Sequence, residues 1–426
     1  MTDWIKALGF IQQLLITIIT LYWAYQLVIS LSGFIKIKEK PRKTDKMHKF
    51  MVIMPAHNEE AVIGHLVDSL QKVDYPKDLI DFYVIADNCT DNTKEVAKEA
   101  GAIVFERNDP TKKTKGYAMD WFLTKKKDEL DNYDAFVVFD ADNIVDANFF
   151  NVMNEKLRQG ENLVQGYRDI KNPTDSWISG GYAIFYWSMN RFYHLARYNI
   201  GLSPLVNGTA FMVRMNLVKD QGWKTHTLTE DIEFSIQNII KGQKLGWAKD
   251  AIVYDEQPTS FKQSWTQRER WTVGHIQTMS SYSSELVKAT VKNKKLMNFD
   301  AVLYIFGIPI LILTLLLLVI NTGLYIIGEI AGKELIINYL RYIIPTFLLP
   351  ILMAYGTVKI EKKPVKPMMK AILMFPIFMG SWLLINIKSL IKPNKTWEKI
   401  EHKKSVGIDD KHIYLGEGKE EKRDEK

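Results

Sequence analysis

Two aspartates, Asp140 and Asp142, stand one residue apart directly after the apolar run AFVVF (135–139). Carboxylates are the hard oxygen ligands that Mg²⁺ and Mn²⁺ prefer. A cation held there can bridge the two phosphates of a nucleotide diphosphate and neutralise the charge on this leaving group. The pair therefore indicates a divalent metal site for a phosphorylated ligand. The alternative is a solvated turn or a helix cap, in which aspartate is also frequent.

A second acidic pair, Glu230 and Asp231, lies in the segment HTLTEDIEFSIQ (226–237). A helix is expected to begin near Thr229, which places both carboxylates at its N-terminus. Transfer of a group onto a hydroxyl needs a base that removes the hydroxyl proton, and one well-placed carboxylate can do this. Asp231 is the candidate base. Capping of the helix by acidic side chains is the alternative.

The segment QRERW combines the amide of Gln267 with two cations, Arg268 and Arg270, and the indole of Trp271. An arginine can grip a departing diphosphate through its bidentate fork. Tryptophan offers an apolar face to a sugar ring, and it also suits a membrane interface. A basic and aromatic membrane anchor is therefore the alternative interpretation.

Two further polar positions belong to loops. Asp87 ends the apolar run DFYVIAD in DNCTDNT (87–93), where its carboxylate can accept hydrogen bonds from a base or a ribose; the alternative is an Asx turn. Lys115 precedes Gly116 in KKTKGYAMDW, where a cation can meet phosphate, and a solvated lysine is the alternative.

The elements that position these residues alternate between strands and helices. Strands are expected at 50–55, 81–87, 102–107 and 134–142, and helices at 59–73 and 93–101. This order predicts an α/β domain with a mostly parallel sheet covered on both sides. Ligands bind beyond the carboxyl ends of such strands, and here those ends are His57–Asn58, Asp87 and Asp140–Asp142.

Apolar runs flank this domain on both sides. Each is long enough to cross a bilayer, which takes about 20 residues, although buried core helices are the alternative. The runs cover about Leu8 to Leu31, Ala301 to Ile327, Ile336 to Val358, and Met368 to Ile391. Between the domain and the second run, Ser283 to Asn298 is expected to form an amphipathic helix at the membrane interface.

Basic residues orient the chain in the membrane. The seven that follow the first run place the central domain in the cytoplasm: Lys36, Lys38, Lys40, Arg42, Lys43, Lys46 and Lys49. Four simple spans would put the C-terminal tail outside, yet this tail is also rich in lysine, so one proline-containing run is either re-entrant or interfacial. The expected regions are a membrane helix at 1–34, a cytoplasmic domain at 35–280, an interface helix at 281–300, a membrane region of two or three spans at 301–392, and a charged tail at 393–426.

Composition narrows the functional classes. The net charge of +7 arises largely beside the apolar runs, which indicates anionic lipid rather than nucleic acid as the partner. Zinc-finger, basic-zipper and ribonucleoprotein motifs are absent from the sequence. Cys89 is the one cysteine, so the chain has no intramolecular disulfide, which fits a reducing compartment.

The order of the motifs resembles that of the family-2 glycosyltransferases, specifically the membrane polysaccharide synthases that make cellulose, hyaluronan, chitin oligosaccharides and poly-N-acetylglucosamine. The resemblance covers about residues 50–280 and the flanking apolar runs. It rests on MPAHNEE (54–60), DNCTDNT (87–93), KGYAMD (115–120), FDADN (139–143), VQGY (164–167), NGTAFMVR (207–214), TED (229–231) and QRERW (267–271). The QxxRW pattern marks the processive branch.

This resemblance implies a GT-A fold, an inverting mechanism and a β-linked product. It implies that Asp142 coordinates Mg²⁺ or Mn²⁺ and that Asp231 is the base, with Glu230 beside it. Donor contacts are implied for Pro55, His57, Glu59, Asp87, Lys115 and Asp140. Contacts to the acceptor or the leaving diphosphate are implied for Gly208, Thr209, Gln267, Arg268, Arg270 and Trp271.

The expected activity is polymerisation of a UDP-sugar, with UDP-glucose slightly favoured over UDP-N-acetylglucosamine, into a β-glycan that the membrane helices help to export. The expected partners are the donor, the growing glycan and membrane lipid, with accessory export subunits possible and nucleic acid excluded. The expected location is a bacterial plasma membrane. A transferase that adds one sugar to a lipid remains the alternative, and a transporter or scaffold without catalysis is disfavoured by the acidic motifs. The tail is too short for a cyclic-dinucleotide domain, and KTWEKIEHKK (395–404) is a candidate gating segment.

Overall fold

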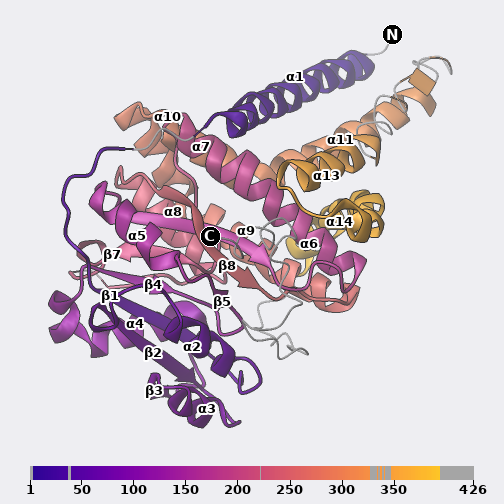
Figure 1. Cartoon of the computed structure of the whole chain (residues 1–426). Coiled ribbons are helices and arrows are strands. Elements are labelled where there is room, and N and C mark those ends of the chain that lie inside the picture. Colours follow the sequence, from indigo (N-terminus) through magenta and orange to yellow (C-terminus); the bar gives the residue numbers. More distant parts are fainter. Residues whose placement is uncertain are drawn as a thin grey trace.

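The computed structural model of the chain describes residues 3–36, 40–220, 222–326 and 347–393, together with residues 333, 336, 337 and 340. An α/β domain occupies the middle of the chain, and apolar helices from both ends lie on one side of it (Figure 1). The tail beyond residue 393, including the candidate gating segment, lies outside the described residues.

The domain is built on an eight-stranded sheet in the order β3-β2-β1-β4-β7-β6-β8-β5. Strands β1 to β4 pair in parallel, as expected, with Phe50 opposite both Ile80 and Ala135. The other half adds antiparallel pairs between β4 and β7, β7 and β6, and β5 and β8, so the sheet is mixed. The strands are β1 (Phe50–Ala56), β2 (Ile80–Asp87), β3 (Ile103–Arg107), β4 (Ala135–Val138), β5 (Ile144–Val145), β6 (Leu163–Ile170), β7 (Phe211–Arg214) and β8 (Gly246–Asp255).

Both faces of the sheet are buried, which explains why its parallel strands are apolar at nearly every position. Successive side chains of a strand point to opposite faces, so Val52 and Met54 enter one core cluster whereas Met51 and Ile53 enter the other. Helices α2 (Ile63–Gln71), α3 (Thr93–Glu99) and α5 (Phe149–Arg158) cover the first face. Helices α4 (Lys115–Lys125), α8 (Glu230–Ile240), α10 (Leu296–Ile305) and part of α9 (Phe261–Asn293) cover the second.

A long helical segment borders the site on the membrane side. It comprises α6 (Trp177–Ser188), a π-helical stretch at Met189–Leu195, and α7 (Ala196–Asn199). Helix α6 begins at a capping box, in which Ser176 and Ser179 bond each other's backbone N–H groups. Helix α6 packs against α14 (Val365–Ile391), and α14 also packs against α9 and α13 (Leu349–Ile360).

Helices α1 (Asp3–Leu31) and α11 (Gly307–Ile326) lie side by side and extend away from the domain (Figure 1). Leu15, Leu317 and Ile320 pack between them, and Gln12 Nε2 donates to Asn321 Oδ1 at 2.7 Å. Three helices of the described part are long and apolar enough to cross a membrane, namely Lys6–Phe34, Gly307–Ile326 and Val365–Ile391. In the third expected run, residues 338, 339 and 341–346 lie outside the described residues, and helix α13 at its end is shorter than a span.

Two expected boundaries differ from the structure. The expected second run begins at Ala301, but Ala301 and Ile305 are buried in the domain core on α10, and the membrane-type helix begins at Gly307. The expected interface helix at 281–300 is divided between the end of α9 and the start of α10. Helix α9 ends at Asn293, and Lys294 after it adopts a left-handed conformation with φ of 51°. Apolar residues in this region therefore serve the domain core as well as the membrane side.

Candidate active site

The loops after β1 and β2 hold each other at the carboxyl edge of the sheet. His57 Nδ1 donates to the carbonyl oxygen of Asp87 at 2.7 Å, and the N–H of Glu59 donates to Thr93 Oγ1 at 2.7 Å. Asn58, between them, has φ of 57°, a conformation that asparagine tolerates better than most residues. The expected donor residues Pro55, His57 and Glu59 thereby line one cavity together with Asp87.

Asp87 is the last residue of β2, and its side chain is fixed by Arg107 at the end of the neighbouring β3. Arg107 Nη1 lies 2.5 Å from Asp87 Oδ1, and Asn88 Nδ2 donates to the same oxygen at 2.9 Å. Burial raises the pKa of Asp87, and Arg107 opposes that shift. Asp87 thus presents a buried carboxylate to the cavity, as a contact to a base or ribose requires.

Lys115 joins three parts of the site. Its Nζ lies 2.5 Å from Asp140 Oδ1, 2.6 Å from the carbonyl oxygen of Gly208 and 3.9 Å from Glu230 Oε1. Thr114 caps α4 and thereby directs Lys115 into the cavity from the first turn of the helix. These contacts exclude the alternative interpretation, in which the side chain of Lys115 is solvated.

The Asp140–Asp142 loop follows a strand that ends at Val138, earlier than expected. Asp140 N–H donates to Thr209 Oγ1 at 3.0 Å, and Thr209 in turn bonds Asn143. Burial disfavours ionisation of Asp140, but Lys115 and Arg168 lower its pKa. Burial raises the pKa of Asp142 to about 6. Asp142 is therefore a buried carboxylate whose ionised form a cation would stabilise.

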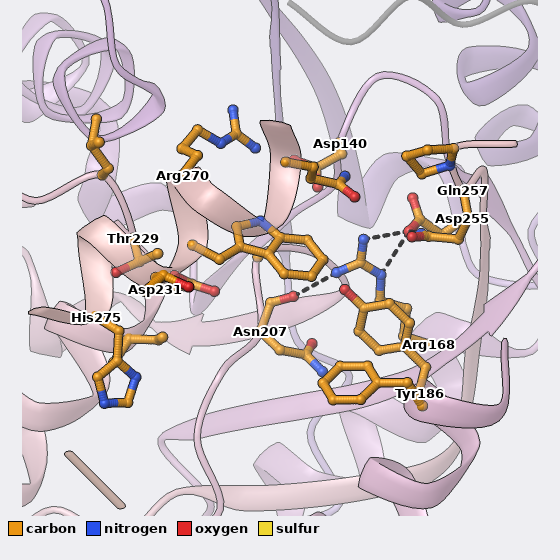
Figure 2. A pocket seen from close by; sticks show the side chains of 18 of the residues that line it. Asp140, Arg168, Tyr186, Asn207, Thr229, Asp231, Asp255, Gln257, Arg270 and His275 are labelled. Atoms are coloured by element: carbon orange, nitrogen blue, oxygen red, sulfur yellow. Dashed lines mark hydrogen bonds and ion pairs between the residues drawn. The ribbon is translucent and has the colours of Figure 1, made fainter. Parts of the chain in front are cut away.

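Gly208 forms an open floor between charged groups, of which Asp140, Arg168 and Asp231 are drawn in Figure 2. A Cβ atom built on Gly208 would lie 3.7 Å from Arg168 Nη1, 3.8 Å from Asp231 Oδ2 and 3.9 Å from Asp140 Oδ2. Gly208 also has φ of 88°, which side chains rarely adopt. Any side chain here would fill the space that Asp140 and Asp231 face, so glycine keeps that space free for a ligand.

Glu230 and Asp231 occupy the first turn of α8, and Thr229 is its N-cap residue, as the sequence predicts. Burial raises the pKa of both carboxyls, and for Glu230 the neighbouring Asp231 adds to the shift. Helix α9 approaches this turn closely, since a Cβ at Gly274 would lie 2.6 Å from Thr229 Oγ1. The turn is therefore held in place by α9 as well as by its own helix.

Helix α9 presents one face to the cavity. Gln267, Trp271 and His275 follow each other at four-residue spacing, so they lie on one side of the helix, with Arg270 beside them. The buried Gln267 Oε1 and Arg270 Nε atoms have no hydrogen-bond partner among the described residues. Unpaired polar atoms in a cavity wall are available to a ligand.

Two expected site residues lie outside the cavity. Arg268 points away from it toward α14, where Nη1 donates to the carbonyl oxygen of Phe378 at 3.0 Å and to Ser381 Oγ at 2.7 Å. The expected diphosphate contact by Arg268 is therefore wrong. A helix turns by about 100° per residue, so Arg268 and Arg270 point to nearly opposite sides, and Arg270 is the one that lines the cavity. Thr209 lies beneath the floor, where it supports the Asp140 loop.

Several cavity residues were not singled out from the sequence. Arg168 donates to Asp255 through Nε at 2.7 Å and to the carbonyl oxygen of Asn207 at 3.0 Å, and it lies over the Tyr186 ring (Figure 2). Gln257 also donates to Asp255. The sequence did contain a signal for these two residues. Asp255 ends the apolar run AIVY of β8, as Asp87 ends that of β2, and Arg168 is a charged residue within β6.

The cavity has a volume of about 1790 Å³ and extends from these charged groups to the apolar helices. Tyr22 and Trp23 of α1 line it, as do Leu311 and Leu315 of α11. Helix α14 contributes further side chains, namely Pro376, Met379, Trp382, Leu383 and Asn386. One continuous space therefore joins a polar donor-type site to an aliphatic region between membrane-type helices.

The sequence matches the description "Glycosyl transferase family group 2" over residues 135–358, which is more than half of the chain. The chain belongs to this glycosyltransferase family. The matched range includes Gly208 and the residues that face it, Asp140, Arg168 and Asp231.

Relatives of this family-2 glycosyltransferase differ in the products that their names state. It is 24% identical to the probable glycosyltransferase YdaM of Bacillus subtilis over 81% of this chain and 83% of that protein. It is 26% identical to the beta-monoglucosyldiacylglycerol synthase of a Nostoc species over 61% of this chain and 55% of that protein. It is 25% identical to the glucomannan 4-beta-mannosyltransferase 7 of Arabidopsis thaliana, over 56% and 45%.

Among solved structures, the glycosyltransferase resembles the mannosyltransferase PcManGT of Pyrobaculum calidifontis, solved with GDP-Man and Mn²⁺. The TM-score is 0.58 with 14% identity, covering 88% of this chain and 99% of the other. The structural similarity shows a shared fold, and at this low sequence identity it shows nothing beyond the fold. The expected GT-A fold with flanking membrane-type helices is thus confirmed.

Proposed function

We propose that this protein transfers a hexose from a UDP-hexose to a hydroxyl of a membrane lipid acceptor, with inversion at the anomeric carbon, and that the product is a glycolipid. The observation that carries the proposal is the convergence at Gly208. There, the candidate base Asp231 and the donor-side Asp140 face the same open floor from opposite elements. The aliphatic end of the cavity supports a lipid as the acceptor.

Each step of the transfer has a candidate residue. Asp231 removes the proton from the acceptor hydroxyl, and the resulting oxygen forms a bond to the anomeric carbon. The bond from that carbon to the diphosphate breaks on the opposite side, which inverts the configuration and releases UDP. Lys115 and Arg270 carry positive charge in the cavity wall, where they oppose the negative charge of the leaving diphosphate.

A divalent cation fits this site. Asp142 is buried, and burial raises its pKa to about 6, so a bound cation would stabilise its charged form. The described part of the chain has no cluster of three or more acidic, histidine or cysteine side chains that could hold a metal alone. Mg²⁺ is commonly held by one or two carboxylates plus substrate phosphates. When bound, such a cation would neutralise charge on the diphosphate.

The lining beyond Asp231 supports the lipid acceptor. Ile308, Leu311 and Leu315 of α11 lie along the cavity, and Met379 and Leu383 of α14 also line it. Aliphatic side chains offer no hydrogen bonds to the hydroxyls of a sugar chain, whereas they suit acyl chains. Two of the aromatic residues that line the cavity, Trp271 and Trp382, are stacked with ring centroids 6.2 Å apart.

Polymerisation is the second candidate, and this aromatic pair favours it. Trp271 and Trp382 offer apolar faces to a sugar at the acceptor end, and Gln267, Arg270 and Trp271 match the QxxRW pattern of the processive branch. A relative named for glucomannan synthesis agrees with it, as the relative named for a glycolipid agrees with the first candidate. The polymer would be a β-glucan or a related β-glycan, and export would need further subunits.

The proposed location is a bacterial plasma membrane with the catalytic domain in the cytoplasm. Lys40, Lys43 and Lys46 follow α1 and favour the cytoplasmic side for the domain. UDP-glucose is slightly favoured over UDP-N-acetylglucosamine as donor.

Radiolabel incorporation tests both candidates. Membranes that contain the protein receive labelled UDP-glucose or UDP-N-acetylglucosamine with Mg²⁺ or Mn²⁺, and products are separated by solvent extraction and by size. Label in a short, organic-soluble product is the expected result. Label in a high-molecular-weight product would overturn the lipid proposal and support polymerisation. Asp231→Asn is the control, and equal incorporation by this variant would contradict the proposed base.

A further inference from the structure

Helix α14 has the length and composition of a membrane span, yet the catalytic domain holds it at both ends. Before its first turn, Lys363 Nζ lies 2.6 Å from Asp169 Oδ2 of β6. In its last turn, Lys388 Nζ lies 2.7 Å from Glu269 Oε2 of α9. A helix of 27 residues is about 40 Å long. A helix that crossed the bilayer would carry one of these ends to the other side, away from the domain.

The middle of α14 also lies on the domain. Gly181 of α6 allows close contact, because a Cβ there would lie 2.8 Å from the ring of Phe378. Arg268 of α9 bonds the carbonyl oxygen of Phe378 and Ser381 Oγ, and Thr272 Oγ1 bonds Asn386 Oδ1 at 3.1 Å. Contacts therefore run along the whole helix.

The two faces of α14 differ in what they contact. One face is buried against the domain and α13, including Met368, Ala371, Ile372, Phe375, Phe378, Ser381, Ile385 and Ser389. The opposite face is an exposed apolar stripe, defined by Met369, Leu373, Ile377, Leu384 and Ile391. Their spacings of four and seven residues place these five side chains on one side of the helix.

Lysines stand at both ends of α14. Lys366 and Lys370 lie in its first turns, and Lys388 and Lys392 lie in its last turn and just after it. A spanning helix carries its basic excess on the cytoplasmic side. An interfacial helix can carry lysines at both of its ends, because both ends lie beside the anionic headgroups of one leaflet. Lysines stand at both ends of α14, with none between Lys370 and Lys388, and basic residues at both ends fit the second arrangement.

The direction of α14 agrees with these contacts. In Figure 1, α1 and α11 run alongside each other away from the domain, whereas α14 is seen nearly end-on. Helix α14 therefore lies across the direction of α1 and α11. If α1 and α11 cross the bilayer, α14 lies along its surface.

We propose that α14 is an interfacial helix that docks on the leaflet next to the catalytic domain. Its apolar stripe enters the boundary between headgroups and acyl chains, and its lysines meet anionic headgroups. The chain after Ile391 then lies on the same side of the membrane as the catalytic domain. This arrangement removes the conflict between the number of apolar runs and the basic tail, because one run does not cross.

Single cysteines test on which side of the membrane the tail lies. Each is introduced into the full-length protein in which Cys89→Ser has removed the native cysteine. Ser405→Cys reports on the tail, Thr44→Cys reports on the domain side, and Thr2→Cys reports on the far side of α1. A membrane-impermeant maleimide is applied to intact cells and to permeabilised cells. We expect Ser405→Cys to follow Thr44→Cys in both conditions. Labelling of Ser405→Cys together with Thr2→Cys would show that α14 crosses and would overturn the proposal.

Spin labels test whether the stripe meets lipid. Cysteines replace Met369, Ile377, Leu384 and Ile391 one at a time in protein reconstituted into vesicles with anionic lipid, and depth is measured from collisions with oxygen and with a water-soluble nickel complex. We expect one shallow depth at all four positions, with Leu14→Cys in α1 as the deep control. A depth that passes through a maximum along α14 would indicate a span. Access to the nickel complex alone at all four positions would indicate a stripe without lipid, and either result would overturn the proposal. Neither measurement uses catalytic activity.

Discussion

Asp231 and Glu230 are neighbours in one helical turn, but their surroundings differ. Asp231 Oδ2 faces the floor at Gly208, whereas Glu230 Oε1 lies 3.9 Å from Lys115 Nζ. A base must be ionised before it can accept a proton, so the raised pKa values of this pair bear on the rate. The difference in placement favours Asp231 over Glu230 as the proposed base.

The raised pKa values of Glu230 and Asp231 are expected to appear in the pH dependence of kcat/KM. Burial raises both pKa values, that of Glu230 to about 7, and Asp231 adds to the shift of Glu230. The acid limb of activity should therefore lie above the ordinary pH range of an aspartate carboxyl, because the pKa of Asp231 is raised. Glu230→Gln removes one negative charge and should move this acid limb to lower pH. An acid limb near pH 4 in the unaltered protein would contradict the assignment.

Asp231→Asn should lower kcat by a factor of about 10² to 10⁴, the usual contribution of a general base. Donor binding should persist, because Asp87, Lys115 and Asp140 are untouched. Calorimetric titration with UDP in the presence of Mn²⁺ measures that binding. Loss of UDP binding along with activity would point to misfolding instead of a lost base.

His275 is expected to position the acceptor. Its Nε2 donates to the carbonyl oxygen of Ile305 at 3.0 Å, and burial lowers its pKa, so the ring is neutral and Nδ1 can only accept. The ring lines the cavity near Asp231 (Figure 2). His275→Ala should raise the acceptor KM about tenfold, the loss of about one hydrogen bond. Donor KM and slow donor hydrolysis without acceptor should stay unchanged, and His275→Gln should restore part of the acceptor affinity. An equal rise in donor KM would contradict this role.

At the scale of elements, α9 has two different faces. Gln267, Arg270 and Trp271 line the cavity. Arg268 and Glu269 do not line it, and their side chains bond α14. Helix α9 therefore lines the cavity with some of its side chains and holds α14 with others. Gly274 of α9 also lies close to Thr229, so α9 contacts the first turn of α8, which carries Glu230 and Asp231.

The two arginines of QRERW provide a matched pair of variants. Arg270→Ala should lower kcat/KM about tenfold or more with little change in melting temperature, because it removes a cation from the cavity wall. Arg268→Ala should lower the melting temperature, because it leaves a gap and unpaired groups between α9 and α14. Thermal unfolding in detergent and initial rates separate the two effects. The reverse pattern would restore Arg268 to the active site.

At the scale of the whole molecule, α1 is joined to the domain by hydrogen bonds to a buried ion pair between Arg197 and Asp300. Arg197 Nε lies 2.8 Å from Asp300 Oδ2, Tyr25 of α1 donates to Asp300 at 3.1 Å, and Gln26 accepts from Arg197. Both charged side chains are 2% exposed. This cluster sets where α1 meets the domain and hence where the cavity reaches the membrane side.

Asp300→Asn should destabilise the protein by about 3–5 kcal/mol, because it leaves the charge of Arg197 buried without its partner. Chemical unfolding in detergent measures the change. The paired variant Asp300→Leu with Arg197→Leu removes both charges and should be closer to the unaltered protein. If the single and paired variants are equally destabilised, the cost comes from packing and not from the unpaired charge.

The sequence determined much of the domain by itself. Apolar runs that end in Ala56–His57, Asp87 and the Asp140 segment predicted the parallel strands and the edge where polar groups meet, because strand burial and loop chemistry are local properties. The TED segment predicted helix α8 with Asp231 in its first turn. The structure brings all the predicted site residues except Thr209 and Arg268 to one cavity.

Only the tertiary structure decided which residues face each other. Arg168 and Asp255 are 87 positions apart, and their pairing depends on β6 and β8 lying together. Arg268 and Arg270 read alike in sequence, but the direction of each depends on where α14 packs. Apolar length likewise leaves open whether α14 crosses the membrane, because composition records hydrophobicity, whereas orientation depends on which face the rest of the protein already covers.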